Sequence, residues 1–271
     1  MTAGQVARVP AKRPPKPAPS PWLPISIIGF LAITWFAASE EFGIGFDIPE
    51  LIGNFTRGFD ILADFFRPNW AFLPQTYEPM IETFAMSVIS SAIGCAVALP
   101  VAFLASRVTT PNLVTYLTSR SILNVVRAIP DILYALIFVA ALAIGPLPGI
   151  LALVLFNIGV VVKLLSETVD GVDPGPIEAT QAAGGNRVQT VRWAVLPQVL
   201  PNYVAYSLYV FELNIRASAV IGIVGAGGIG RLITTERRFF NYDNLSVILI
   251  EIFVFVFLIE LVSISVRRRL V

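Results

Sequence analysis

Histidine is absent from this chain of 271 residues, and cysteine occurs once, at Cys95. Histidine is the commonest metal ligand and a frequent general base in proteins. Its absence excludes a histidine-based catalytic triad and a Cys/His metal site. A single cysteine has no partner for a disulfide within the chain, so it reports nothing about the redox compartment.

Charge is scarce as well. Charged residues make up 14% of the chain and apolar residues 56%, with a mean hydropathy of +0.76. Soluble domains average about 25% charged residues, so these few charges cannot cover a water-facing surface. The composition therefore predicts an integral membrane protein with the lipid bilayer as solvent for much of its surface. A formal net charge of +1 gives no reason to expect a nucleic-acid partner.

Six apolar stretches approach the roughly 20 residues that a helix needs to cross the hydrocarbon core. The predicted fold class is therefore all-α, with six transmembrane helices. These stretches are Trp22–Ser39, Phe84–Ala105, Ser121–Ile144, Leu147–Leu165, Leu200–Val220 and Leu245–Val266.

The distribution of Lys and Arg predicts the orientation, because cytoplasmic segments carry an excess of both. With the N-terminus inside, twelve fall in inner segments and five in outer segments. Both termini are therefore expected in the cytoplasm. The inner set is Arg8, Lys12, Arg13, Lys16, Arg107, Arg120, Lys163, Arg187, Arg192, Arg267, Arg268 and Arg269, and the outer set is Arg57, Arg67, Arg231, Arg237 and Arg238.

The chain divides into five expected parts. Residues 1–21 form a basic, proline-rich cytoplasmic tail, typical of disorder. Residues 22–39 form a retained first anchor, because a signal-peptide core runs only about 7–15 residues. In residues 40–78 an apolar stripe at helical spacing predicts an amphipathic segment at the outer interface. Residues 79–266 form the main transmembrane domain, and residues 267–271 a basic cytoplasmic end.

The longest inner loop, Ser166–Leu196, has a defined pattern. Helix-favouring residues run from Ile177 to Ala183 and again from Arg187 to Val195, on either side of Gly184 and Gly185. Glycine adopts positive φ readily, so the pattern predicts two short helices joined by a glycine elbow. A hairpin of this size cannot bury a core of its own, and a protein surface covering it is one explanation. Folding against the chain's own membrane domain is the other.

This loop resembles the EAA loop of binding-protein-dependent ABC permeases. The family pattern is Glu-Ala-Ala, three residues, Gly, nine residues, Ile, any residue, Leu, Pro. Glu178-Ala179-Thr180, Gly184 and Leu196-Pro197 follow it at that spacing, with Thr180 and Ala194 as departures. The resemblance implies a core of the type I ABC importer permease kind in a bacterial plasma membrane. It also implies that the loop, with Glu178, Ala179, Thr180, Gly184, Gly185, Leu196 and Pro197, is a coupling helix that docks on an ATPase subunit.

Further segments resemble phosphonate importer permeases, over about residues 60–268. They are residues 65–70, 127–131, 159–163 with Glu167, 214–218 and 222–230. The resemblance implies a phosphonate-like anion delivered by an extracytoplasmic binding protein. Methionine permeases share the EAA loop and a similar glycine cluster, so a methionine importer is the alternative.

No Gly-Lys-Ser/Thr sequence occurs, so the chain has no phosphate-binding loop of the Walker A type. We therefore expect no ATPase activity and no cofactor in this chain, with ATP and Mg²⁺ bound by the partner ATPase. One coupling loop per chain implies two ATPase copies and a second copy of this chain.

Charges and glycines in or next to the spans are the candidate pathway or gate residues. Charges inside a membrane are costly and often functional, but Arg127 with Asp131 and Glu212 with Arg216 stand four apart and could simply pair on one helix face. Gly225-Ala226-Gly227-Gly228-Ile229-Gly230 matches a dinucleotide fingerprint, which we reject because it follows a membrane span. A tight turn or part of an outer gate remains. The candidates are Arg127, Asp131, Glu212, Asn214, Arg216, Ser218, Gly225, Gly227, Gly228 and Gly230.

Two other classes of function fit the sequence less well. A secondary transporter driven by an ion gradient usually shows internal repeats, and no clear repeat relates residues 22–144 to residues 147–266. An intramembrane enzyme would need its acids as catalysts, because there is no histidine and no paired nucleophile.

Overall fold

The computed structural model describes residues 22–39, 45 and 48–268, and within these all regular secondary structure is helical. The predicted tail at residues 1–21 and the last residues of the predicted basic end lie outside the described residues. The chain divides into two units, Met1–Phe59 and Asp60–Val271.

The first unit contains α1 (Trp22–Ala38) and α2 (Ile48–Gly53), and α3 (Phe55–Phe65) begins in it. The apolar side chains of α1 are exposed, as a helix in lipid requires, and none is buried. At 17 residues, α1 is shorter than the four long helical runs that could cross a membrane. The amphipathic segment predicted at residues 48–66 is helical, but it consists of two helices that meet at Asn54.

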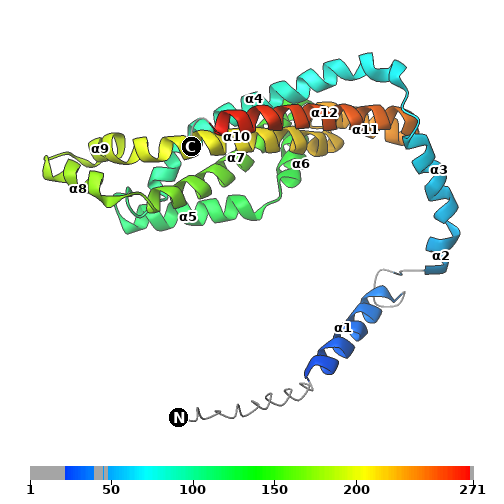
Figure 1. Ribbon diagram of the computed structural model, residues 1–271, viewed down its shortest axis with the longest axis horizontal. Helices are drawn as coiled ribbons and strands as arrows, with labels where there is room; N and C mark the ends of the chain where they lie inside the picture. The colour runs from blue at the N-terminus through cyan, green and yellow to red at the C-terminus, as the bar shows by residue number, and fades with distance from the viewer. Residues whose placement is uncertain (1–21, 40–44, 46–47, 269–271) are drawn as a thin grey trace, which may run out of the picture. The chain divides into compact units, whose positions relative to one another are not determined.

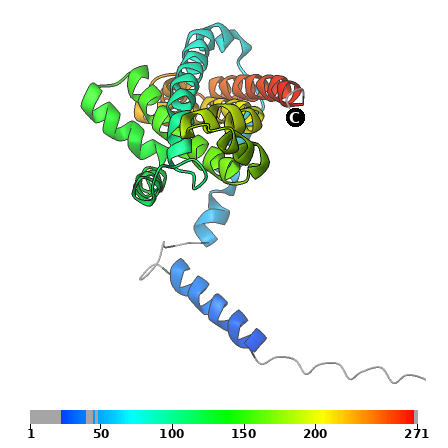
Figure 2. The same ribbon diagram turned by 90° about the vertical axis from the view of Figure 1, so that its left-hand side faces the viewer.

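The second unit holds four helical runs long and apolar enough to cross a membrane. A short helix, η1 (Trp70–Phe72), leads into α4 (Leu73–Leu104), which begins well before the predicted Phe84. The other three long helices are α7 (Pro146–Asp170), α10 (Leu196–Ile221) and α12 (Tyr242–Arg267). Figure 1 shows the four long helices side by side, and Figure 2 shows α12 at the edge of the bundle.

The third predicted span is not one straight helix. It consists of α5 (Leu113–Ala128) and α6 (Asp131–Leu142), which are bent by 84° at the break (Figure 1). Pro130 cannot donate a backbone hydrogen bond and disfavours helical geometry in the residue before it. Ile129 is accordingly extended, with φ −92° and ψ 122°. The described residues thus contain four long runs, or five candidate spans if the bent pair is one, and the predicted count of six depends on the shorter α1.

The second arm of the predicted hairpin is not a separate helix either. It consists of α9 (Arg187–Thr190) and a π-helical turn at Val191–Val195, and it continues into α10. The predicted second run ended at Val195, just before Leu196-Pro197, whereas the helix continues through both residues. The π turn allows the helix to continue, because the N–H of Leu196 bonds to the carbonyl of Val191. Pro197 then occupies the first turn of α10, where proline is tolerated.

The core lies where α7 packs on α4, with α5, α6 and α10 also in contact with α7. Small residues on α4, including Ala98 and Ala102, are fully buried against Val161 and Leu165 of α7. Small side chains let membrane helices approach closely, and packing is what holds such helices together. The candidate sites lie on or beside this tightly packed α4–α7 pair.

Candidate functional site

The EAA-like loop forms a helical hairpin whose first arm is α8 (Pro174–Ala182). Asp173 caps this helix by accepting a hydrogen bond from the N–H of Gly175 at 2.9 Å. At the elbow Gly184 has φ +81°, and the N–H of Gly185 donates to the carbonyl of Thr180 at 2.9 Å. The predicted glycine elbow is therefore present, for the backbone reason that predicted it.

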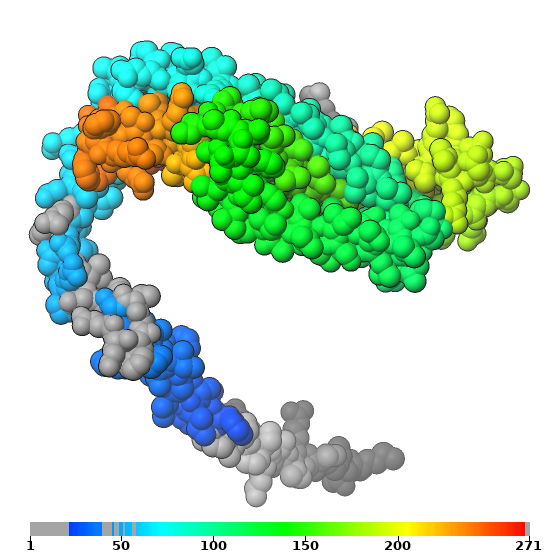
Figure 3. Space-filling view, turned by 180° about the vertical axis from the view of Figure 1, so that it is seen from behind, coloured from blue at the N-terminus to red at the C-terminus, as the bar shows by residue number. Residues whose placement is uncertain are grey.

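The hairpin projects from one end of the second unit (Figure 3). Glu178, Ala179 and Gly184 are exposed on it, whereas Leu196 is only partly exposed because it begins the long helix α10. Two large apolar side chains are also exposed here, Val188 at 76% and Trp193 at 66%. A projecting surface with uncovered apolar side chains is typical of a site where another protein binds.

The hairpin is tied to the membrane helices by a few specific contacts. The side chain of Gln198, on α10, accepts a hydrogen bond from the N–H of Asp173 at 3.0 Å and donates to the carbonyl of Ala194 at 2.7 Å. Ile177 of α8 packs against the main core. A displacement of α8 would therefore be passed directly to α10.

Asp170, at the end of α7, is a residue that the sequence analysis missed. Its carboxylate accepts hydrogen bonds from the Ser106 hydroxyl at 2.6 Å, the Arg107 N–H at 2.7 Å and the Arg120 guanidinium at 3.0 Å. These partners lie 50 to 64 residues away along the chain, so no local motif links them. Asp170 thus joins the end of α7 to the segment that follows α4 and to the middle of α5, just before the hairpin in the chain.

The glycine-rich segment is a buried turn between α10 and α11 (Ile229–Arg238), and it begins with the short helix η3 (Gly222–Val224). Gly225, Gly227 and Gly228 have positive φ values of +91°, +85° and +68°. Helices flank the turn on both sides, so the rejected dinucleotide site has neither the strand nor the βαβ unit that it needs.

Close contacts explain why these positions are glycine. A Cβ on Gly228 would lie 2.6 Å from the Thr83 hydroxyl oxygen of α4, and a Cβ on Gly227 would lie 3.0 Å from the backbone N of Pro146. The same Thr83 oxygen accepts a hydrogen bond from the N–H of Ile229 at 2.8 Å. The turn thus packs both on α4, at Thr83, and on the first residue of α7, Pro146. A gate function for these glycines stays a prediction.

Four charged side chains connect α10 to α12. Glu212 accepts hydrogen bonds from Arg216 at 2.7 Å and Arg267 at 3.3 Å, and Glu260 lies 3.8 Å from Arg216. The pairing predicted for Glu212 and Arg216 is confirmed. Arg267, with which the predicted basic end begins, is the last residue of α12 and contacts the buried Glu212.

Asn214 and Ser218, two other candidate pathway residues, are buried within the bundle. Asn214 donates to the hydroxyls of Ser90 at 3.1 Å and Ser91 at 2.7 Å, which joins α10 to α4. Ser218 donates to the carbonyl of Ile215 at 2.9 Å on its own helix. Both serve packing in this structure, and their place in a pathway stays a prediction.

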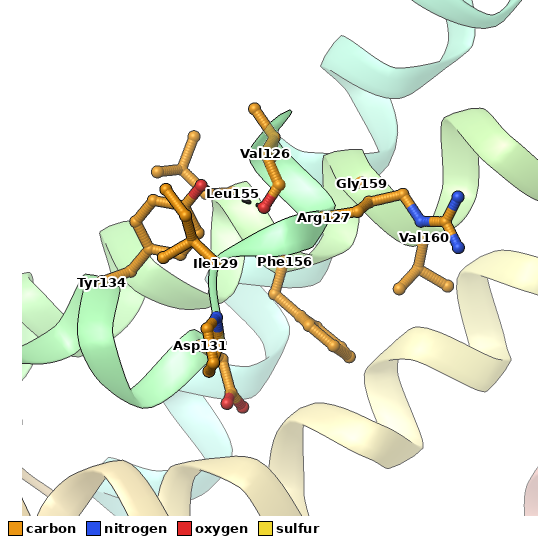
Figure 4. A pocket seen from close by; sticks show the side chains of 10 residues that line it. Val126, Arg127, Ile129, Asp131, Tyr134, Leu155, Phe156, Gly159 and Val160 are labelled. Atoms are coloured by element: carbon orange, nitrogen blue, oxygen red, sulfur yellow. Dashed lines mark hydrogen bonds between the residues drawn. The ribbon is translucent and has the colours of Figure 1, made fainter. Parts of the chain in front are cut away.

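Arg127 and Asp131 do not form the predicted pair. The break at Pro130 places them on different helices, and no hydrogen bond or ion pair joins them in the described part of the chain. The Asp131 carboxylate instead accepts a hydrogen bond from the N–H of Ile132 at 2.9 Å. Figure 4 shows Arg127 extending over Gly159 toward Val160, and Asp131 pointing away from it.

Arg127 lines two cavities. The first, of about 310 Å³, lies around the break and also contains Asp131 and Tyr134. The second, of about 480 Å³, also contains Lys163 and Arg267. The sequence analysis singled out Arg127 but not this grouping, because the three cations belong to three different helices.

Residues 98–271 match the family described as "Binding-protein-dependent transport system inner membrane component". The chain is 44% identical over 190 residues to "Phosphate-import permease protein PhnE" of Mycolicibacterium smegmatis. That match covers 70% of this chain and 36% of the longer relative. The chain is also 39% identical over 202 residues to "Phosphite transport system permease protein PtxC" of Stutzerimonas stutzeri, covering 74% of each.

Among solved structures, the chain resembles an inward-facing form of the MetNI methionine ABC transporter. The TM-score is 0.64 at 25% identity, covering 72% of this chain and 96% of the other. The fold of most of this chain is therefore already known from a transporter.

Proposed function

The chain belongs to the binding-protein-dependent inner membrane transport components, and from this membership we propose that it is the permease of an ATP-driven importer for a phosphorus oxyanion. It is a multi-pass membrane protein, and its own residues perform no covalent chemistry. The observation that carries the proposal is the projecting EAA-like hairpin at residues 174–195, with Glu178 exposed on it.

Two relatives support the choice of substrate class. Proteins named for phosphate and phosphite import are 44% and 39% identical to this chain, whereas the methionine transporter that it resembles in structure is 25% identical. Methionine import is therefore the second candidate. Membership of a binding-protein-dependent family also favours ATP-driven import over an ion-gradient mechanism.

The partners follow from the same proposal. Two ATPase subunits, which bind ATP and Mg²⁺, contact the hairpins of two copies of this chain, and an extracytoplasmic binding protein delivers the anion to the opposite side. The hairpin and both termini then lie in the cytoplasm, and the glycine-rich turn lies near the outer mouth.

The contacts suggest how the hairpin transmits motion. When the ATPases close, α8 is displaced, and the Asp173–Gln198 hydrogen bond and Ile177 pass the movement to α10 and the core. ATP binding then shifts the population between outward-open and inward-open states, which requires that the ATPases bind one state more tightly than the other.

The test is a charge reversal at Glu178. We expect Glu178→Lys to lower substrate uptake at least tenfold and to weaken co-purification of the ATPase, because the exposed carboxylate lies on the docking surface. The matched control is Glu78→Lys, at an exposed residue of α4 near the opposite end, which should leave co-purification unchanged. Normal uptake by an assembled Glu178→Lys complex would refute the coupling role.

A further inference from the structure

The cavity of about 480 Å³ lies among four helices and is lined by cations. Arg127 comes from α5, Lys163 from α7 and Arg267 from α12, while α10 contributes Tyr206 and Tyr209. No carboxylate is among its lining residues. Its volume lies within the range of about 300–1,000 Å³ that is typical of small-molecule sites.

The three cations differ in how far their charge is already balanced. Lys163 pairs with Glu167 one turn along α7, and Arg267 lies 3.3 Å from Glu212. Arg127 has no ion pair and no hydrogen bond from its guanidinium in the described residues. The cavity therefore has an excess of positive charge, centred on Arg127. Arg216, by contrast, lies between Glu212 and Glu260 and does not line the cavity.

The position of Arg127 depends on the missing side chain of Gly159. A Cβ at residue 159 would lie 2.9 Å from the Cγ of Arg127, so only glycine leaves room for the arginine stem to cross α7 (Figure 4). Gly159 is thirteen residues into α7, which places the crossing about 20 Å from the outer end of that helix at 1.5 Å per residue. An unpaired arginine at such depth lowers the stability of the protein, and charges kept in membranes at such a cost commonly have a function.

The chemistry of the lining fits a tetrahedral oxyanion. A guanidinium presents five N–H donors and an ammonium three, and both bind phosphate-type oxygens through charge-assisted hydrogen bonds. The hydroxyl of Tyr206, which is 2.9 Å from that of Thr168, adds a polar group at the same wall.

We propose that Arg127, Lys163 and Arg267 form an anion-binding subsite for the phosphorus oxyanion on its path through the protein. The subsite deepens the proposed function and rests on it. The same chemistry would also suit the phosphate of a lipid headgroup, so the experiment has to distinguish the free solute from the lipid.

The experiment uses the full complex with its ATPase and binding protein in sealed vesicles, and measures ATP-dependent uptake of phosphite, methylphosphonate and inorganic phosphate. Arg127→Gln, Lys163→Gln and Arg267→Gln should each lower uptake of the transported anion about tenfold, which corresponds to about 1.4 kcal/mol. Arg127→Lys should restore most of the uptake, because it keeps the charge. Arg268→Gln is the matched control, since Arg268 is exposed, adjacent to Arg267 and absent from the cavity lining.

The outcomes separate cleanly. If the unaltered complex takes up none of the three anions, the proposed function fails before the subsite is tested. If it takes up one, and the glutamine variants do so at the same rate as Arg268→Gln, the subsite is wrong while the importer stands. Vesicles of phosphatidylcholine, with and without phosphatidylglycerol, form the second arm. Defects confined to vesicles containing phosphatidylglycerol would assign the cluster to lipid and overturn the proposal.

Discussion

Gly230 shows at the scale of one residue how closely the glycine-rich turn is packed. A Cβ at this position would overlap the carbonyl oxygen of Ala219, and it would lie 2.8 Å from the Cα of Gly222. Both obstacles are backbone atoms, which cannot move aside as a side-chain end can. The requirement for glycine here is therefore steric, whereas at Gly225 it is also conformational, because φ is +91°.

We expect Gly230→Ala to destabilise the protein by about 1–3 kcal/mol, the usual cost of forcing extra atoms into a well-packed region. The measurement is thermal unfolding of the purified protein in detergent. Gly171→Ala is the control, because its added Cβ would lie 3.7 Å from its nearest neighbours, at ordinary contact distance. Equal unfolding temperatures for the two variants would show that the turn can open without cost.

Asp170 shows at the same scale how one polar side chain joins several segments of the chain. One carboxylate holds a hydroxyl and a backbone N–H from the segment after α4, and a guanidinium from the middle of α5. Removing the carboxylate of this part-buried network would leave three donors without their partner, which costs more than the net worth of the hydrogen bonds. Asp170 is thus a structural residue close to the hairpin, and nothing in the local sequence indicates it.

At the scale of elements, the hairpin depends on its elbow. Gly184 has φ +81°, and nothing lies within 4 Å of where its Cβ would be. The position therefore tests backbone conformation without any effect of crowding. Asparagine visits the left-handed region with little cost, whereas a β-branched residue does not.

We expect Gly184→Val to lower uptake and ATPase co-purification severalfold, because a left-handed conformation costs an ordinary residue about 1–2 kcal/mol and the hairpin would change shape. Gly184→Asn should retain both. The measurement is uptake in vesicles together with the amount of ATPase that co-purifies. Equal loss in both variants would mean that the elbow needs glycine for contact with a partner rather than for its backbone angle.

The bend between α5 and α6 is the second element that decides the site. It separates Arg127 from Asp131, which a continuous helix would have placed on one face. Arg127 stays on α5, where it lies across Gly159 and lines the same cavity as Lys163 and Arg267, while Asp131 begins α6. The break thus converts an expected ion pair into an unpaired cation.

At the scale of the whole molecule, the second unit has two well-separated ends. The hairpin with Val188 and Trp193 is at one end, and α11, with Arg237 and Arg238 in its last turn, is at the other (Figure 1). The excess of Lys and Arg among the predicted inner segments predicts that the hairpin end lies in the cytoplasm.

This orientation predicts the accessibility of single cysteines. Cys95 is buried and is the only cysteine in the sequence, so a Cys95→Ala background is suitable for labelling. Val188→Cys should react with a membrane-impermeant maleimide only after the cells are permeabilised, and Arg238→Cys should react in intact cells. The reverse pattern would invert the orientation and remove the hairpin from any cytoplasmic ATPase.

Much of this architecture could be predicted from the sequence, because its causes are local. Scarce charge and long apolar runs indicate a helical membrane protein, and the Glu178–Gly184–Pro197 spacing marks the hairpin. The i,i+4 spacing of Glu212 and Arg216 predicted their pairing, which the structure confirms because both lie on the unbroken helix α10.

What the tertiary structure alone decided is what depends on contacts between distant segments. The hydrogen bonds of Asp170 to Ser106, Arg107 and Arg120 are one example, because these residues are 50 to 64 positions away from it along the chain. The grouping of Arg127, Lys163 and Arg267 arises because α5, α7 and α12 pack around one cavity. Helical periodicity determines which face of a helix a side chain occupies, but only the packing of whole helices determines which faces meet.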